Sequence, residues 1–169
     1  MKLNKSIIEK CKDEALKKVL LKLEQLNDYY SLLEGSVVSY TKVFDIIGKM
    51  PVQLKEWLKI FDGGHLFFIS MLTTQEHVDG LDYPTFQNVN SNHYKRQHNI
   101  AAEAACFAIA SDGDLYCFDS EEGSDKVYEW DSHEGKAVDE WDNFAEWLSD
   151  RIDFALSEIK EGILTPMKD

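Results

Sequence analysis

The sequence predicts an α+β fold, in which antiparallel strands form a central sheet and helices pack on it. Three segments carry this prediction: an apolar hairpin at residues 104–119, an amphipathic helix at residues 5–33, and a second amphipathic helix that begins at Phe144. Strands joined by a tight turn pair antiparallel, and a helix with one apolar stripe needs a surface to cover.

The hairpin consists of two apolar runs separated by Asp112-Gly113. Glycine tolerates the positive φ of a type I′ turn, so these two residues are expected to form the whole loop. Ile109 then lies opposite Tyr116. This register predicts a bulky face with Phe107, Ile109, Tyr116 and Phe118. It predicts a small face, suited to a close helix, with Cys106, Ala108, Ala110, Leu115 and Cys117.

A further strand is expected at residues 126–131, near the edge of the sheet, because polar and apolar side chains alternate there. Trp130 is expected to face the core, whereas Glu129 and Asp131 lie on the wet face. An acidic loop, residues 119–125, connects this strand to the hairpin.

The remaining elements follow from helical periodicity and from capping residues. Residues 5–33 predict one long helix, with a capping box at Ser6–Glu9, so residues 1–36 are expected to form an N-terminal helical extension. Pro51 suits the start of a helix over Val52–Phe61, and Asp62-Gly63-Gly64 is expected to end it. The apolar run His65–Leu72 then enters the sheet. At the other end, Asn143 is expected to cap a C-terminal helix of about five turns.

The charge is unevenly distributed. The chain has 169 residues and a formal net charge of −13. Residues 111–161 contain 17 acidic and 4 basic side chains, so the whole imbalance lies in the C-terminal third. Such a field repels nucleic acid and anionic membranes and attracts a basic protein, although acidic side chains can also serve only to keep a surface hydrated.

The cysteines show no metal-ligand spacing. In the predicted register Cys106 and Cys117 are diagonal neighbours, about 7–8 Å apart, which is too far for a relaxed disulfide. Three unpaired thiols predict a reducing compartment, and neither a signal peptide nor a membrane-spanning segment is evident. A cytoplasmic protein is therefore expected.

No catalytic motif is present: the chain lacks a nucleophile elbow, a phosphate-binding glycine-rich loop and a zinc-binding His-Glu-x-x-His helix. The aspartates near residue 112 do not have the spacing of a calcium loop. The sequence therefore predicts a protein that is not an enzyme and that has no cofactor and no bound metal.

The order of the motifs resembles one known family. The string Met50–Gly64, with Pro51 and Asp62-Gly63-Gly64, is similar to the Leu-Pro, helix, Asn-Gly-Gly segment of the SUKH superfamily, Smi/Knr branch. Phe107–Asp119 resembles its Gly-Asp strand pair, Val127–Asp131 the following strand, and Phe144–Leu148 the closing helix. These matches follow the family's order over residues 41–156.

The resemblance implies a single α+β domain, residues 1–169, with a mostly antiparallel central sheet. It also implies the function of most bacterial members, which are immunity proteins that bind and neutralise a cognate toxin, often a nuclease. The family is not regarded as catalytic. The yeast relatives suggest an alternative, an intracellular regulatory or scaffolding adaptor, and a small hydrolase or metal-dependent enzyme is a third reading.

A one-sided negative field would suit an inhibitor of a basic toxin, because it speeds encounter and adds affinity. Seven carboxylates on the loop, on the wet face of the strand and on the next loop are expected to share one exposed surface that binds the partner. They are Asp119, Glu121, Glu122, Asp125, Glu129, Asp131 and Glu134.

Overall fold

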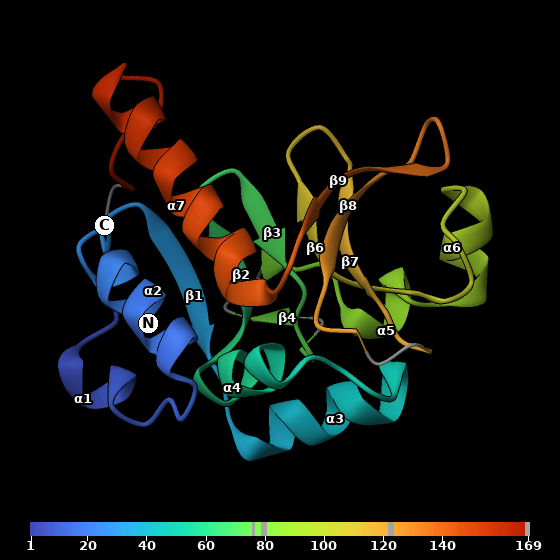
Figure 1. The fold of residues 1–169 in the computed structure, drawn as a ribbon, viewed down its shortest axis with the longest axis horizontal. Helices are drawn as coiled ribbons and strands as arrows, with labels where there is room; N and C mark the ends of the chain where they lie inside the picture. The colour runs from blue at the N-terminus through green and yellow to red at the C-terminus, as the bar shows by residue number, and fades with distance from the viewer. Residues whose placement is uncertain (76, 79–80, 122–123, 168–169) are drawn as a thin grey trace.

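The computed structural model describes residues 1–75, 77–78, 81–121 and 124–167, and its centre is an antiparallel sheet (Figure 1). In the described residues the sheet has seven strands in the order β1-β2-β3-β6-β7-β8-β9. Their bounds are β1 Tyr30–Glu34, β2 Phe61–Leu66, β3 Ile69–Met71, β6 Ala104–Ala110, β7 Leu115–Asp119, β8 Val127–Asp131 and β9 Lys136–Trp141. A separate short pair consists of β4 (His77–Val78) and β5 (Leu81–Asp82).

Helices surround this sheet, and α7 and α2 pack against each other over one face of it (Figure 1). The helices are α1 Lys5–Ile8, α2 Glu14–Glu24, α3 Val37–Ile47, α4 Val52–Ile60, α5 Phe86–Val89, α6 Asn92–Gln97 and α7 Phe144–Lys160. One cluster of buried side chains extends from Leu3 to Ala155. The predicted α+β class, with its antiparallel sheet and its terminal helices, is confirmed.

The N-terminal segment is helical but is not one long helix. It contains two helices, since Asn4 caps α1 and Asp13 accepts a hydrogen bond from the backbone N–H of Leu16 at the start of α2. The last residues of the predicted helix form β1, which pairs with β2. Helical periodicity could not predict that residues 30–34 pair with β2, because this pairing is a long-range interaction.

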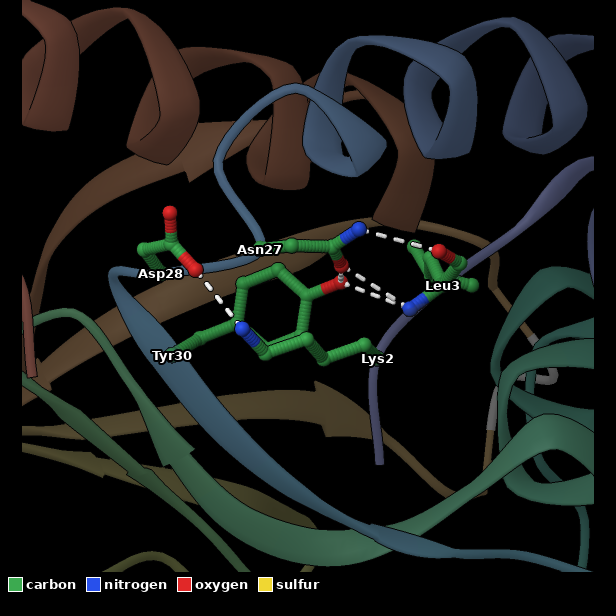
Figure 2. A network of polar contacts seen from close by, with 5 residues as sticks. All are labelled: Lys2, Leu3, Asn27, Asp28 and Tyr30. Atoms are coloured by element: carbon green, nitrogen blue, oxygen red, sulfur yellow. Dashed lines mark hydrogen bonds and ion pairs between the residues drawn. The ribbon is translucent and has the colours of Figure 1, made fainter. Parts of the chain in front are cut away.

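The first residues of the chain are attached to the start of β1 (Figure 2). The backbone N–H of Leu3 donates to Asn27 Oδ1 at 2.9 Å and to the Tyr30 hydroxyl at 3.1 Å, and Asn27 Nδ2 donates back to the carbonyl of Leu3. Lys2 forms an ion pair with Asp28 at 2.7 Å. Tyr30 is buried, which raises its pKa to about 12. These contacts make the N-terminal segment part of the packed structure.

The helix expected over Val52–Phe61 is confirmed as α4, but the Asp62-Gly63-Gly64 motif that was expected to end it lies inside strand β2. Helix α4 ends at Ile60, and β2 begins at the next residue. The apolar run after the glycines is also not one strand, because it turns back at Phe67 and Phe68 to form the β2–β3 hairpin. The glycines are needed because neighbouring strands approach closely: a Cβ on Gly64 would lie 2.4 Å from the carbonyl oxygen of Ser31 on β1.

Asp62 is 1% exposed, and its carboxylate is fully surrounded by donors. Thr74 donates from its backbone N–H at 2.8 Å and from its hydroxyl at 2.6 Å, and the hydroxyl of Ser39 on α3 donates at 3.0 Å. Thr73 and Gln75 donate at 3.3 Å. The carboxylate therefore joins α3, β2 and the segment after β3.

The hairpin β6–β7 forms as predicted, but its register was wrong. Ala108 pairs with Tyr116 and Ile109 with Leu115, and a bulge lies between Cys106 and Ala108. The loop is longer than two residues, because the backbone N–H of Ala110 donates to the carbonyl of Asp114 at 2.8 Å and leaves three residues, 111–113, between them. Within the turn, the side chain of Asp112 accepts the backbone N–H of Asp114 at 3.2 Å.

The new register moves three residues of β6, Ala108, Ile109 and Ala110, to the other face relative to β7. Ile109 pairs with Leu115 instead of belonging to the bulky face, and Ala108 shares a face with Tyr116. Phe107 and Tyr116 keep their predicted role and contact Trp147 on α7, at ring distances of 4.9 and 5.2 Å. The bulge lets both large rings face the same helix.

Two further predictions concern the C-terminal part. The C-terminal helix is confirmed as α7, with the side chain of Asn143 accepting the backbone N–H of Glu146. The strand at 127–131 is β8, but it is not an edge strand, because β9 pairs with its outer side. Residues of β9 are mostly exposed, so they lack the apolar run on which strand prediction relied.

We predict that Gly64→Ala unfolds at a much lower urea concentration than Gly48→Ala. Both positions have positive φ, which costs an L-residue about 1–2 kcal/mol. Only Gly64 also has backbone atoms in the way of a Cβ, whereas nothing lies within 4 Å of a Cβ at Gly48. Equal midpoints for the two variants would show that strand β1 can move aside at no cost.

We predict that Asp62→Ala lowers the free energy of unfolding by at least about 1.5–3 kcal/mol, the contribution of one hydrogen bond to a charged group. Several buried donors lose their acceptor together. Asp62→Asn retains one acceptor oxygen and should lose less. Urea unfolding measures both, and a neutral effect of Asp62→Ala would contradict the role given to this carboxylate.

Candidate functional site

The carboxylates that were expected to bind a partner lie near both ends of strand β8. Asp119 ends β7, and Glu121 and Asp125 follow on the β7–β8 loop. Asp131 ends β8, and Glu134 lies in the β8–β9 turn at the opposite end of that strand. Since β8 has five residues, about 13 Å separates its ends. The described carboxylates therefore do not form one continuous cluster, and Glu122 lies outside the described residues.

Several of these carboxylates have local structural partners. Asp119 Oδ1 accepts the backbone N–H of Glu121 at 2.8 Å. Asp131 Oδ1 accepts the backbone N–H groups of His133 and Glu134, both at 2.8 Å, and these bonds hold the pKa of Asp131 below its ordinary value. Glu134 forms an ion pair with Lys136. These side chains shape the loops in which they lie.

A different group of carboxylates comes together at the end of the sheet where β6–β7 and β8–β9 turn. Burial raises the pKa of Asp114, and the neighbouring charges of Asp112 and Asp131 raise it further. Burial also raises the pKa of Glu129, and Asp114, Asp112 and Asp139 add to this effect. We call Asp112, Asp114, Glu129, Asp131 and Asp139 the turn-end carboxylates. Two of them belong to the predicted set.

A pocket of about 340 Å³ opens beside the turn-end carboxylates. Its walls combine acidic side chains with aromatic ones from the β2–β3 turn, the β6–β7 turn, β8 and the C-terminal half of α7. The residues that matter here are Phe68, Asp112, Tyr116, Glu129, Arg151 and Phe154. Phe154 is 50% exposed. Exposed aromatic side chains and arginine are enriched in protein interfaces, so the aromatic wall is suited to contact with a partner.

Arg151 lies at the aromatic side of the pocket. Its guanidinium is 5.2 Å from the ring centre of Trp141 and 5.9 Å from those of Tyr116 and Phe154. Nη1 donates to the Tyr116 hydroxyl at 3.2 Å, and Nη2 pairs with Asp150. These contacts hold Arg151 in one orientation, because its stacking and its hydrogen bonds restrict the planar group together.

Glu129 is the half-buried carboxylate at the acidic side of the pocket. No hydrogen bond to its side chain occurs among the described residues, in contrast to Asp131 two residues later. Burial is the main cause of its raised pKa, and Arg151 partly opposes the rise. A partly desolvated carboxylate without a donor in a pocket is suited to receive a cation or a hydrogen-bond donor from a binding partner.

Sequence reasoning missed Arg151, Phe154, Asp112 and Phe68. A signal was present for Phe154, since it falls outside the apolar stripe of α7, and an off-stripe aromatic predicts an exposed ring. Arg151 is one of two arginines in the chain. What could not be predicted is that α7 places both residues beside the β6–β7 turn, because that depends on the register of the hairpin.

A comparison with family models decides the relationship that the motifs suggested. The model described as SMI1 / KNR4 family (SUKH-1) matches residues 45–150, more than half of the chain. The chain belongs to the SMI1/KNR4 family. No curated protein shows a significant match to it. The family match covers α4, the Asp62-Gly63-Gly64 strand, the β6–β7 hairpin and the first part of α7.

Membership in the SMI1/KNR4 family sets the range of functions. The family includes toxin immunity proteins and cell-wall regulators, and its members are typically not catalytic. Among the described residues, no three histidine, cysteine, aspartate or glutamate side chains are grouped so that they could hold a metal ion. Within the same residues, no helix is long and apolar enough to cross a membrane.

We predict that Glu129→Gln is at least as stable as the parent protein near neutral pH. The pKa of Glu129 is raised in the folded protein, so ionisation of this carboxylate disfavours folding above that pKa. This unfavourable effect is lost as the pH falls below about 4, the ordinary pKa of glutamate. The advantage of the variant should therefore disappear in acid.

Urea unfolding of the parent and Glu129→Gln at a series of pH values measures this effect. Glu121→Gln is the matched control, because Glu121 is exposed at the other end of β8. If Glu129→Gln were less stable than the parent at neutral pH, attraction to Arg151 would outweigh the cost of burial.

Proposed function

We propose that this protein is an immunity protein that binds and neutralises a basic toxin through the pocket and the turn-end carboxylates. The observation that carries the proposal is the arrangement of Glu129: a half-buried carboxylate, without a hydrogen-bond donor, beside an exposed aromatic wall. In a family whose members include immunity proteins, a site built for binding and not for chemistry favours this function.

The occupant we assign to the pocket is a lysine or arginine side chain of the toxin. Glu129 and Asp112 would pair with its charge, and Phe154 and Phe68 would pack along its aliphatic part. Arg151 does not take the place of this cation, because its guanidinium is bonded to Tyr116 and Asp150. The positive charge of this side chain would compensate Glu129 for the hydration that it loses when the complex forms.

The carboxylates at the other end of β8 have a different part in the proposal. Asp119, Glu121 and Asp125, with Glu122 next to them in the sequence, contribute to the long-range field that attracts a basic protein. Asp131 and Glu134 lie at the pocket end, where Asp131 supports the turn. Contact and attraction are thus assigned to separate groups of residues, and they can be tested separately.

The first test is co-expression with a toxin gene adjacent to the gene of this protein, with survival and co-purification as readouts. Protection and a stable complex are expected. A parent protein that neither protects the cell nor binds the toxin contradicts the immunity function and favours an adaptor role in the cell.

We predict that Asp112→Lys/Glu129→Lys loses protection, whereas Glu121→Lys/Asp125→Lys largely keeps it. Both double variants change the net charge equally, so they are matched controls for each other. The pocket variant should weaken the complex at least about tenfold, mainly through faster dissociation. The loop variant should mainly slow association, and this effect should shrink at high salt.

Surface plasmon resonance with the purified toxin, at low and high salt, separates the two rates. Circular dichroism melts establish that each variant is folded. Equal losses in both variants would show that only the overall field matters. Full binding by both would place the interface elsewhere on the protein.

A further inference from the structure

The side chains of Cys106 and Cys117 meet in the middle of the sheet. The two residues are directly opposed on β6 and β7, and their sulfur atoms are 2.9 Å apart. Both are free thiols and fully buried. We propose that this pair is a modification site, at which hydrogen peroxide oxidises the two thiols to a reversible cross-strand disulfide.

The expected diagonal arrangement of these cysteines was wrong, because the observed register differs from the expected one at two places. The longer turn shifts the pairing by one residue and the bulge at Phe107 shifts it by one more, so that Cys106 lies directly opposite Cys117. A pair that the predicted register held too far apart is thereby brought within reach of a bond.

The backbone around Cys106 favours the geometry of a disulfide. Its N–H donates to Asn90 Oδ1 at 2.8 Å, and its carbonyl accepts from Asn90 Nδ2 at 2.9 Å. The backbone groups of Cys106 therefore point away from Cys117, which makes the two cysteines a non-hydrogen-bonded pair. Such pairs have Cα atoms about 4.5 Å apart, inside the range of about 4.4–6.8 Å found in disulfides. Bond formation then requires movement of the sulfur atoms and little movement of the strands.

The segment that contains α5 and α6 covers this pair and controls its access. Asn90 belongs to this segment, and burial, with a smaller effect of Cys106, raises the pKa of Tyr94 on α6. Burial and the contact with Cys106 raise the pKa of the Cys117 thiol. The Cys117 thiol is therefore protonated and slow to react while the segment is closed, and oxidation proceeds when it opens locally.

The chemistry is complete with peroxide as the oxidant. One cysteine thiolate attacks a peroxide oxygen, the O–O bond breaks, and a sulfenic acid and water result after protonation. The second sulfur attacks the sulfenic sulfur, the S–S bond forms, and the S–O bond breaks to release a second water. Two thiols are oxidised and one peroxide is reduced to two waters, and an excess of dithiothreitol reverses the change.

Cys11 provides an internal control in the same molecule. It is also buried, but its thiol donates to the backbone carbonyl of Asp13, and among the described residues no second cysteine lies beside it. Cys11 is treated with the same peroxide but, in the described part of the chain, has no second thiol with which to form a disulfide. Selective linkage of the other two cysteines would therefore reflect the geometry of the pair.

The experiment treats the folded protein with hydrogen peroxide, then unfolds it, alkylates remaining thiols and maps the peptides by mass spectrometry. Trypsin leaves both cysteines in one peptide, residues 97–126, because no lysine or arginine lies between them. A protease that cuts at aspartate cleaves at Asp112 or Asp114, between the cysteines. The expected product is a linked pair of peptides that lacks two hydrogen atoms, with Cys11 alkylated.

The linked protein should also melt at a higher temperature than the reduced one, and dithiothreitol should remove this shift, because the cross-link restricts the unfolded chain. Cys117→Ala should show neither the linked peptides nor the shift. Full alkylation of Cys106 and Cys117 in the peroxide-treated protein, or linkage to Cys11 instead, would overturn the proposal. If Cys117→Ala fails to fold, peptide mapping of the parent protein still tests the proposal. The mapping does not depend on a toxin partner.

Discussion

The buried carboxylate of Asp62 holds together the part of the fold on which the rest is built. It accepts hydrogen bonds from Ser39 on α3 and from the segment Thr73–Gln75. A charged group can be buried at this position because every direction around it offers a donor. Gly64 lets β1 approach β2 closely, and Gly63 lets the segment after β3 approach it, so one short motif joins α3, the sheet and the segment that leads to α5.

A second constraint is the bulge at Phe107. One extra residue in β6 lets Phe107 and Tyr116 both reach Trp147, and it brings Cys106 opposite Cys117. Tyr116 then meets Arg151, whose position defines one side of the pocket. Tyr116 and Cys117 are consecutive residues of β7, so the pocket and the cysteine pair lie on opposite faces of the same strand.

The acidic charge of the C-terminal third acts in two ways. Several carboxylates, such as Asp131, support turns or pair with nearby lysines, and the acidic side chains together give the surface a negative field. Glu129 differs because it is partly buried and no hydrogen bond reaches it from the described residues. Partial desolvation, and not the density of charge along the sequence, therefore distinguishes the carboxylate proposed to contact the partner from the carboxylates that only contribute to the negative field.

Local patterns in the sequence were sufficient to predict the class of the fold, the helices near both ends of the chain, the β6–β7 hairpin and the family. Each of these rests on local information, such as the apolar stripe of α7, the cap at Asn143 and the spacing of the family motifs. Tertiary structure alone decided the hairpin register, the strand β1, the edge strand β9 and the gathering of Arg151, Phe154 and Glu129 around one pocket. The reason is physical: capping and periodicity involve residues a few positions apart, whereas strand register and pocket composition depend on contacts between distant segments.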